Sequence, residues 1–121
     1  MPRIIIIDDD AVLRETLARI LTEAGHNVTV TVNGFEGVKA FRTEPGDLIL
    51  TDIMMPYGGL PTIRVLRAEF PNLKIIAMSG GGKPRLDIAE GLGANRTLAK
   101  PFSSRELLDA IDETLGAAPA P

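Results

Sequence analysis

The segment DLILTDIMMP, residues 47–56, decides the fold of this chain. Its run from Leu48 to Leu50 is apolar throughout, which favours a strand buried on both faces, although the pattern alone leaves a helical segment open. Asp52 follows where that strand should end, and Pro56 stops regular structure soon afterwards. Open α/β sheets carry their sites at the carboxyl ends of strands, so Asp52 is a candidate site residue. Taken alone, an aspartate at such a place is more often a loop cap.

Length and composition indicate one globular domain, which we expect over residues 1–116, with a flexible tail over 117–121. The 121 residues are 45% hydrophobic and 24% charged, enough for one core. The net charge of −3 gives no sign of binding to nucleic acid or to an anionic membrane. The first apolar run is too short for a signal peptide or a membrane span. The absence of cysteine excludes disulfides and thiolate metal sites and is compatible with the cytoplasm, where we expect the protein.

Apolar strands alternate with helices along the whole chain. The expected strands are 4–7, 28–32, 48–50, 74–78 and 97–99, and the expected helices are 11–24, 35–42, 61–70, 84–92 and 104–115. This alternation predicts an α/β fold, a parallel sheet with helices on both faces. The valine–threonine alternation over 28–32 predicts a strand near the edge of the sheet with one wetter face.

Helix ends and buried faces can also be predicted. Asp10 and Asn33 are well placed to cap the first two helices, and Ser103 with Glu106 forms a capping box before the last. The spacing of apolar positions predicts these inward residues: Val12, Leu13, Thr16, Leu17, Ile20 and Leu21 in the first helix, and Ile63, Val65 and Leu66 in the third. His26 lies just past a helix stop, so we expect a solvated loop residue.

Residues capable of chemistry follow four of the five strands. Asp8 and Asp9 end the first strand, Asp52 the third, Ser79 the fourth and Lys100 the fifth. In a parallel sheet these ends share one edge. Two carboxylates about 5 Å apart repel by roughly 3 kcal/mol at an effective dielectric constant of about 20, which a cation must offset. Oxygen ligands at a partly open site suit Mg²⁺.

Three glycines follow Ser79, so a hydroxyl and freely oriented backbone N–H groups are available for phosphate oxygens. Each of these polar residues has a simpler reading as a helix cap, a turn residue or a surface charge. Taken singly, the simpler reading is the commoner one. It is improbable that the simpler reading holds for every one of these residues, since they stand at successive strand ends.

The chain resembles the receiver domain of bacterial two-component response regulators, of the stand-alone, CheY-like kind, over residues 3–115. The matching pieces are IIIIDDD with Arg14 beyond it, DLILTDIMMP, the strand ending in Met78-Ser79-Gly80, and LAKPF at 98–102. The resemblance implies a flavodoxin-like (βα)5 three-layer sandwich with strand order 2-1-3-4-5.

The resemblance also implies roles for the residues at the strand ends. Asp52 is similar to the phosphoryl acceptor, Ser79 to the switch hydroxyl, and Lys100 to the cation that pairs with the phosphoryl group, with a cis peptide expected before Pro101. The Mg²⁺ ligands that the resemblance implies are Asp9 and Asp52 directly, Asp8 through water, and the backbone carbonyl of Met54.

Two features depart from the family pattern. The loop before Gly59-Leu60 is one residue shorter than usual, and position 97, often aromatic, is Thr97. The departure at position 97 puts the aromatic half of the switch in doubt, but not phosphorylation. Tyr57, the sole tyrosine, is not assigned that role.

Three functions compete. The first is a signalling receiver, not an enzyme except in assisting its own phosphorylation and dephosphorylation. Its phosphoryl donor is a histidine kinase or phosphotransfer protein, and its unknown output partner reads the face of helix 84–92, strand 97–99 and helix 104–115. We expect a monomer or weak dimer with no direct contact to nucleic acid or membrane.

The second is a small magnesium-dependent phosphatase or phosphotransferase. Such enzymes commonly place a second acid two residues after the nucleophile, where this chain has Met54, and need a cap domain, for which there is no room. The third is a receiver-like module that binds partners without phosphate, against which the complete acidic and cationic set argues.

Overall fold

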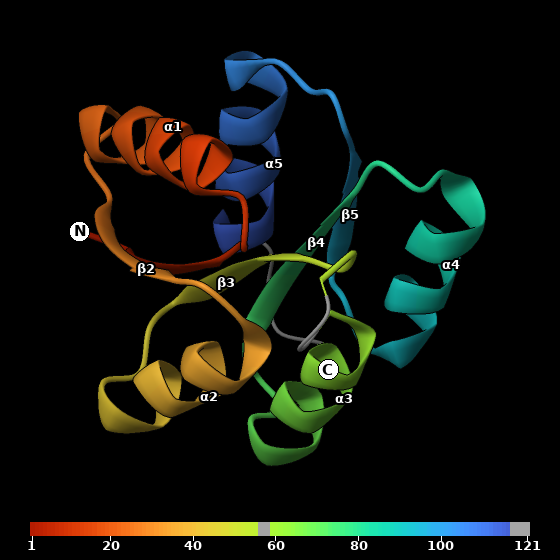
Figure 1. Ribbon diagram of the computed structural model, residues 1–121. Helices are drawn as coiled ribbons and strands as arrows, with labels where there is room; N and C mark the ends of the chain where they lie inside the picture. The colour runs from red at the N-terminus through yellow and green to blue at the C-terminus, as the bar shows by residue number, and fades with distance from the viewer. Residues whose placement is uncertain (56–58, 117–121) are drawn as a thin grey trace.

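Five parallel strands form the centre of the computed structural model, which describes residues 1–55 and 59–116 (Figure 1). The strands are β1 (Arg3–Ile7), β2 (Asn27–Thr31), β3 (Leu48–Asp52), β4 (Lys74–Ser79) and β5 (Arg96–Ala99). They pair in the order β2-β1-β3-β4-β5, so the predicted order 2-1-3-4-5 is confirmed. Tyr57 and the expected tail of residues 117–121 lie outside the described residues.

Helices cover both faces of this sheet (Figure 1). They are α1 (Ala11–Glu23), α2 (Gly34–Thr43), α3 (Leu60–Glu69), α4 (Lys83–Leu92) and α5 (Ser104–Gly116). Helices α1 and α5 pack with one face of the sheet, and α2, α3 and α4 with the other. None of the helices in the described ranges is both long and apolar enough to cross a membrane.

The central strands divide their side chains between two cores. In β1, Ile5 and Ile7 join the core under α2, α3 and α4, whereas Ile4 and Ile6 join the core under α1 and α5. Successive residues of a strand point to opposite faces, so a strand covered on both sides needs an unbroken apolar run. The run from Leu48 to Leu50 follows the same rule and is a fully buried strand.

The predicted caps are present. The Asp10 carboxylate accepts hydrogen bonds from the N–H groups of the second and third residues of α1, at 3.0 and 3.2 Å. Asn33 accepts one from Glu36 N at 2.9 Å. The capping box before α5 is complete, because Ser103 N donates to Glu106 Oε1 at 3.1 Å and Glu106 N donates to Ser103 Oγ at 3.0 Å. These bonds set where three of the helices begin.

Three of the predicted inward positions are wrong. Val12 is 75% exposed, Thr16 is exposed and donates its hydroxyl to the Val12 carbonyl, and Val65 is 43% exposed. The buried stripe of α1 is centred on Leu17 and Leu21. At about 100° per residue, Thr16 lies roughly 120° and Val12 roughly 160° around the helix from the midline of that stripe, which is narrower than the apolar pattern indicates.

The prediction for His26 is also wrong. His26 is only 8% exposed, and its Nδ1 has no hydrogen-bond partner in the described part of the chain. Gly25, with φ at +94°, turns the chain back at the end of α1, and the His26 N–H donates to the Leu21 carbonyl at 3.0 Å. The turn therefore folds the imidazole inward instead of leaving it in a loop.

Strand β2 lies at an edge of the sheet, as predicted. Near its carboxyl end, however, a threonine side chain is buried and the two neighbouring valine side chains are exposed. Thr31 is buried and donates its hydroxyl to the Ile6 carbonyl at 3.0 Å, whereas Val30 is 47% exposed and Val32, just beyond the strand, is 41% exposed. The hydrogen bond lets a polar side chain occupy the inner face.

Candidate functional site

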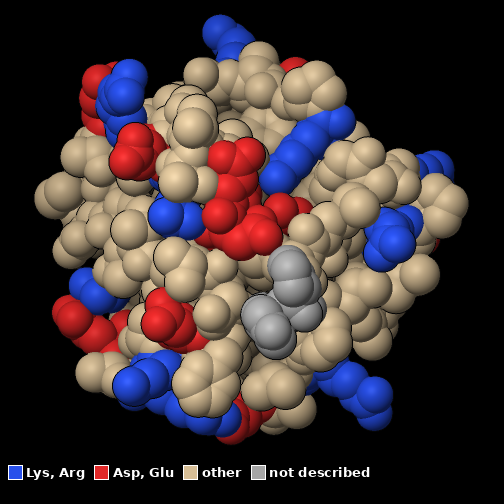
Figure 2. Space-filling view, viewed as in Figure 1, with Lys and Arg blue, Asp and Glu red and all other residues tan. Residues whose placement is uncertain are grey.

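Three aspartates meet at the carboxyl edge of β1 and β3, which are neighbouring strands. Asp8 and Asp9 directly follow β1, and Asp52 is the last residue of β3. One carboxylate oxygen of each lies within 4.8 Å of the others. Figure 2 shows acidic side chains gathered in the middle of this face of the molecule. Asp9 is exposed, whereas Asp8 and Asp52 are buried, so the cluster opens to solvent on one side.

The Asp8 carboxylate is completely buried. Its Oδ1 accepts a hydrogen bond from Asp10 N at 2.9 Å, and its Oδ2 lies 3.4 Å from Lys100 Nζ. Arg14 Nη1 donates to the Asp8 carbonyl at 2.8 Å and so fixes the backbone here. Burial raises the pKa of Asp8, and the charge of Asp52 raises it further, while the Asp10 hydrogen bond and Lys100 lower it; burial has the largest effect.

The Asp52 carboxylate is held by one contact on each oxygen. Oδ1 accepts a hydrogen bond from Met54 N at 3.0 Å, and Oδ2 lies 3.2 Å from Lys100 Nζ. The backbone is fixed nearby, because Ile53 N donates to the Met78 carbonyl at 3.0 Å. The carboxylate is therefore oriented with one oxygen toward the ammonium group.

Lys100 bridges the two buried acids from the end of β5. Its N–H donates to the Ser79 carbonyl at 2.9 Å, which joins the ends of β4 and β5. The peptide bond between Lys100 and Pro101 is cis, as the family resemblance implies. The side chain is 22% exposed and its Nζ lies within salt-bridge distance of both Asp8 and Asp52.

Ser79 is buried at the end of β4. Its Oγ accepts a hydrogen bond from Gly81 N at 2.9 Å, which closes the first turn of the glycine loop. The loop continues through Gly82, whose φ of +90° is a backbone conformation that glycine adopts without strain. In this arrangement the Ser79 hydroxyl oxygen accepts its hydrogen bond from the loop that follows it.

One neighbour of the site was not predicted. A Cβ built on Gly81 would lie 2.6 Å from Arg85 Cδ and 2.7 Å from Met54 Sδ. The thioether that follows Asp52 and the first turn of α4 therefore both pack close against the glycine loop. The glycine run indicates a compact loop, but sequence spacing carries no signal for this contact.

The residues present fit a divalent cation. Three carboxylates face one ammonium group, so the ionised cluster keeps excess negative charge. All the donors are oxygen atoms, and the exposed Asp9 leaves one side accessible to water. Hard cations such as Mg²⁺ prefer such a donor set and keep water and phosphate among their ligands. The Asp8, Asp9 and Asp52 cluster can therefore hold a metal ion.

Known proteins resemble this chain throughout its length. A family model described as the response regulator receiver domain matches residues 4–112. The response regulator receiver protein CpdR of Brucella abortus (strain 2308) is 34% identical over 120 residues, covering 98% of this chain and all of that protein. The chemotaxis protein CheY of Thermotoga maritima is 33% identical over 114 residues, covering 92% of this chain and 95% of that protein.

Solved structures give the same result. The crystal structure of a CheY-like response regulator receiver domain protein from Methanospirillum hungatei JF-1 has a TM-score of 0.90 at 28% identity, covering 95% of this chain and 94% of that one. The strand order and the helix placement described above are thus shared with a protein of that class.

Proposed function

Because the chain belongs to the response regulator receiver domain family, whose members accept a phosphoryl group in two-component signalling, we propose that Asp52 is the acceptor. The observation that supports this assignment is the contact of 3.2 Å between Asp52 Oδ2 and Lys100 Nζ inside the acidic cluster. Asp52 joins three properties: a place at a strand end, two acidic neighbours and a fixed cation. Among the described residues, Asp9 forms no ion pair or hydrogen bond with Lys100, and Asp8 is fully buried.

The proposed reaction is transfer from a phosphohistidine donor. A carboxylate oxygen of Asp52 forms a bond to phosphorus as the P–N bond breaks, and the electron pair of that bond stays on the imidazole nitrogen, which takes up a proton. Such transfer depends mainly on positioning and on stabilising the charge of the equatorial oxygens. Met54 N holds one Asp52 oxygen in place, and Lys100 supplies a positive charge beside the other. Hydrolysis of the acyl phosphate returns the carboxylate and inorganic phosphate.

The acidic cluster would hold Mg²⁺ for this reaction. We assign Asp9 and Asp52 as direct ligands, Asp8 as a ligand through water, and the Met54 carbonyl as a further protein ligand. When bound, the ion would neutralise charge between the carboxylates and the incoming phosphoryl group. Asp8 would contribute by remaining ionised beside the ion, with its Oδ1 fixed by Asp10 N.

The output would use Ser79 and the elements next to it. In our proposal Ser79 gives up the hydrogen bond from Gly81 N, and its hydroxyl donates to the phosphoryl group instead. Residues 1–116 act as the switching domain. The partner would read the face formed by helix 84–92, strand 97–99 and helix 104–115. On that face Ile88 is 51% exposed, and an ion pair between Arg96 and Glu113 joins β5 to α5. The family supports partners of this general kind, a phosphoryl donor and an output protein.

Mass spectrometry after incubation with acetyl phosphate and Mg²⁺ tests the assignment. We expect the wild type to gain one phosphoryl group and Asp52→Asn to gain none. Asp10→Asn is the matched control, because asparagine also caps helices and should leave labelling at the wild-type rate. Labelling of Asp52→Asn at the wild-type rate would overturn the assignment. Loss of labelling in Asp10→Asn as well would show that the assay reports helix integrity instead of the acceptor.

A further inference from the structure

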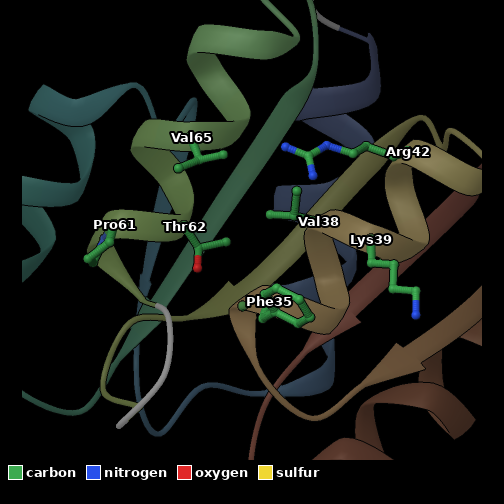
Figure 3. A pocket seen from close by; sticks show the side chains of 8 residues that line it. Phe35, Val38, Lys39, Arg42, Pro61, Thr62 and Val65 are labelled. Atoms are coloured by element: carbon green, nitrogen blue, oxygen red, sulfur yellow. The ribbon is translucent and has the colours of Figure 1, made fainter.

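An apolar groove lies between α2 and α3, apart from the acidic cluster (Figure 3). It has a volume of about 530 Å³ and is lined by Gly34, Phe35, Val38, Lys39, Arg42, Pro61, Thr62 and Val65. Figure 3 shows Thr62 and Val65 of α3 on the side that faces Val38 and Phe35 of α2. None of these residues has a part in the reaction proposed above, so the groove needs an explanation of its own.

The groove exposes large apolar side chains in an unusual way. Phe35 is 77% exposed at the start of α2 and Val65 is 43% exposed on α3, while Val38 between them is 8% exposed and forms the floor. Scattered apolar residues are normal on a protein surface, but contiguous ones around a hollow indicate a binding surface. The departure of Val65 from its predicted inward position thus has a structural context: it forms a wall of the groove.

Two contacts join α2 to α3 and fix the spacing between the walls of the groove. At one end Arg42 of α2 binds Glu69 of α3 through two hydrogen bonds, one of them 2.9 Å from Arg42 Nε to Glu69 Oε2. In the core on which both helices pack, the rings of Phe41 and Phe70 meet edge to face with their centroids 4.5 Å apart. The hollow is therefore already formed, and a ligand would not have to open it at a cost in free energy.

The charges at the groove are positive where they are not already paired. Lys39 lines the groove with its stem and directs its ammonium group away from α3, along the outer side of α2 (Figure 3). Within the described ranges it forms no ion pair and no side-chain hydrogen bond. Arg42 contacts Glu69 through Nε and Nη2, which leaves its Nη1 free to donate. An occupant with acidic groups on its α2 side would complement both cations.

We propose that this groove binds an acidic amphipathic helix of a partner protein. Apolar side chains of the helix would enter between Phe35 and Val65 above Val38. Carboxylates on its α2 side would face Arg42 Nη1, and would reach the Lys39 ammonium group once that side chain turns from its position in Figure 3 toward the groove. Helix-in-groove recognition of this type uses apolar anchors at helical spacing. A second copy of the chain fits less well, because a symmetric pair brings the same cations of both copies to one seam.

A pair of synthetic peptides tests the proposal with the intact protein. The first is an amphipathic helix with leucines at positions i, i+3 and i+7 flanked by glutamates, and the second replaces those glutamates by lysines. We expect the acidic peptide to shift the amide signals of α2 and α3 and the basic peptide to bind about tenfold or more weakly. Lys39→Glu should reverse that preference, and Phe35→Ser should weaken binding of the acidic peptide by about tenfold or more.

Val12→Ser is the matched control, since Val12 is 75% exposed near the start of α1, outside both the groove and the proposed output face. It should leave peptide binding unchanged, and Phe35→Ser should leave labelling of Asp52 unchanged. Equal weakening by Phe35→Ser and Val12→Ser, or absence of shifts in α2 and α3, would overturn the proposal. So would a wild type whose sedimentation shows a dimer that Phe35→Ser abolishes, because the occupant would then be a second copy.

Discussion

Lys100 reaches the Asp52 carboxylate at 3.2 Å from a different strand end, with the Asp8 carboxylate 3.4 Å away on its other side. This arrangement ties the end of β5 to the ends of β1 and β3 across the edge of the sheet. It places one positive charge among three carboxylates, so both the stability of the protein and its reactivity depend on this side chain.

Replacing Lys100 by methionine should lower both the stability of the folded protein and its rate of labelling. The two buried carboxylates lose their shared cation, and removing one partner of a buried ion pair leaves an uncompensated charge, so we expect the free energy of unfolding to fall by about 1–3 kcal/mol. Labelling by acetyl phosphate should slow by about tenfold or more. Lys83→Met is the control, because Lys83 pairs with Asp87 on the exposed surface of α4. Equal effects of the two substitutions would contradict the role given to Lys100.

Asp8→Asn should stabilise the metal-free protein, and more so as the pH rises. The folded-state pKa of Asp8 is raised, mainly by burial, so the folded state binds its proton more tightly than the unfolded state does. The Asp8 contribution to stability is present at low pH and is lost as the pH rises from the ordinary value of 3.8 through the raised pKa. Asparagine does not titrate and escapes that loss.

Urea unfolding in EDTA, compared at each pH for Asp8→Asn and the wild type, measures this effect. The difference in unfolding free energy should grow with pH across the window above the ordinary value. Using the difference cancels the titration of the other carboxylates. A difference that is constant or that shrinks with rising pH would contradict the raised pKa of Asp8.

Magnesium should bind weakly without any phosphoryl group and stabilise the folded state. At a concentration about ten times its dissociation constant, the gain in unfolding free energy should be about 1.4 kcal/mol. Amide shifts near Asp9 should accompany the titration, and Asp9→Ala should reduce them. An undiminished response in Asp9→Ala would show that the ion binds elsewhere.

Gly37→Ala should destabilise the protein although alanine favours helices. A Cβ at this position of α2 would lie 2.3 Å from Ile7 Cδ1, within the core under β1. Overpacking of this kind costs about 1–3 kcal/mol, which outweighs the gain in helix propensity of up to about 1 kcal/mol. Gly91→Ala in α4 is the matched control, because nothing lies within 4 Å of its Cβ position, and it should be stabilising. Thermal unfolding of both variants checks the pair.

The sequence predicted the sheet because its central strands are buried on both faces. Unbroken runs such as Ile4–Ile7 leave few alternatives, and polar residues placed directly after them must meet at one edge. The burial of His26 and the exposure of Val12 could not be predicted, because each depends on a turn or on the exact width of a helix–sheet contact. The groove beside Val65 depends on the spacing between two helices, which no single-helix periodicity encodes.

Phosphorylation should act on the glycine loop and on α4. In the unmodified protein, Gly81 N donates to Ser79 Oγ at 2.9 Å. If the Ser79 hydroxyl turns to the phosphoryl group, that amide loses its acceptor and residues 80–83 must rearrange. Thr97 is stiff about its first torsion angle and changes little surface by turning, whereas glycines rearrange at low steric cost.

Hydrogen exchange with and without a phosphoryl mimic should therefore show altered protection from Gly80 to Leu92, with α2 unchanged as an internal control. To move the protein from a mostly inactive conformation to one that is active in a ratio of 99:1, phosphorylation would need to stabilise the active conformation by about 5.5 kcal/mol. Contacts with one hydroxyl and one ammonium group supply less, so we expect only a partial shift. Unchanged protection over residues 80–92, with changes confined to residues 54–60, would contradict this route. The signal would then leave through the loop after Asp52 instead of through Ser79.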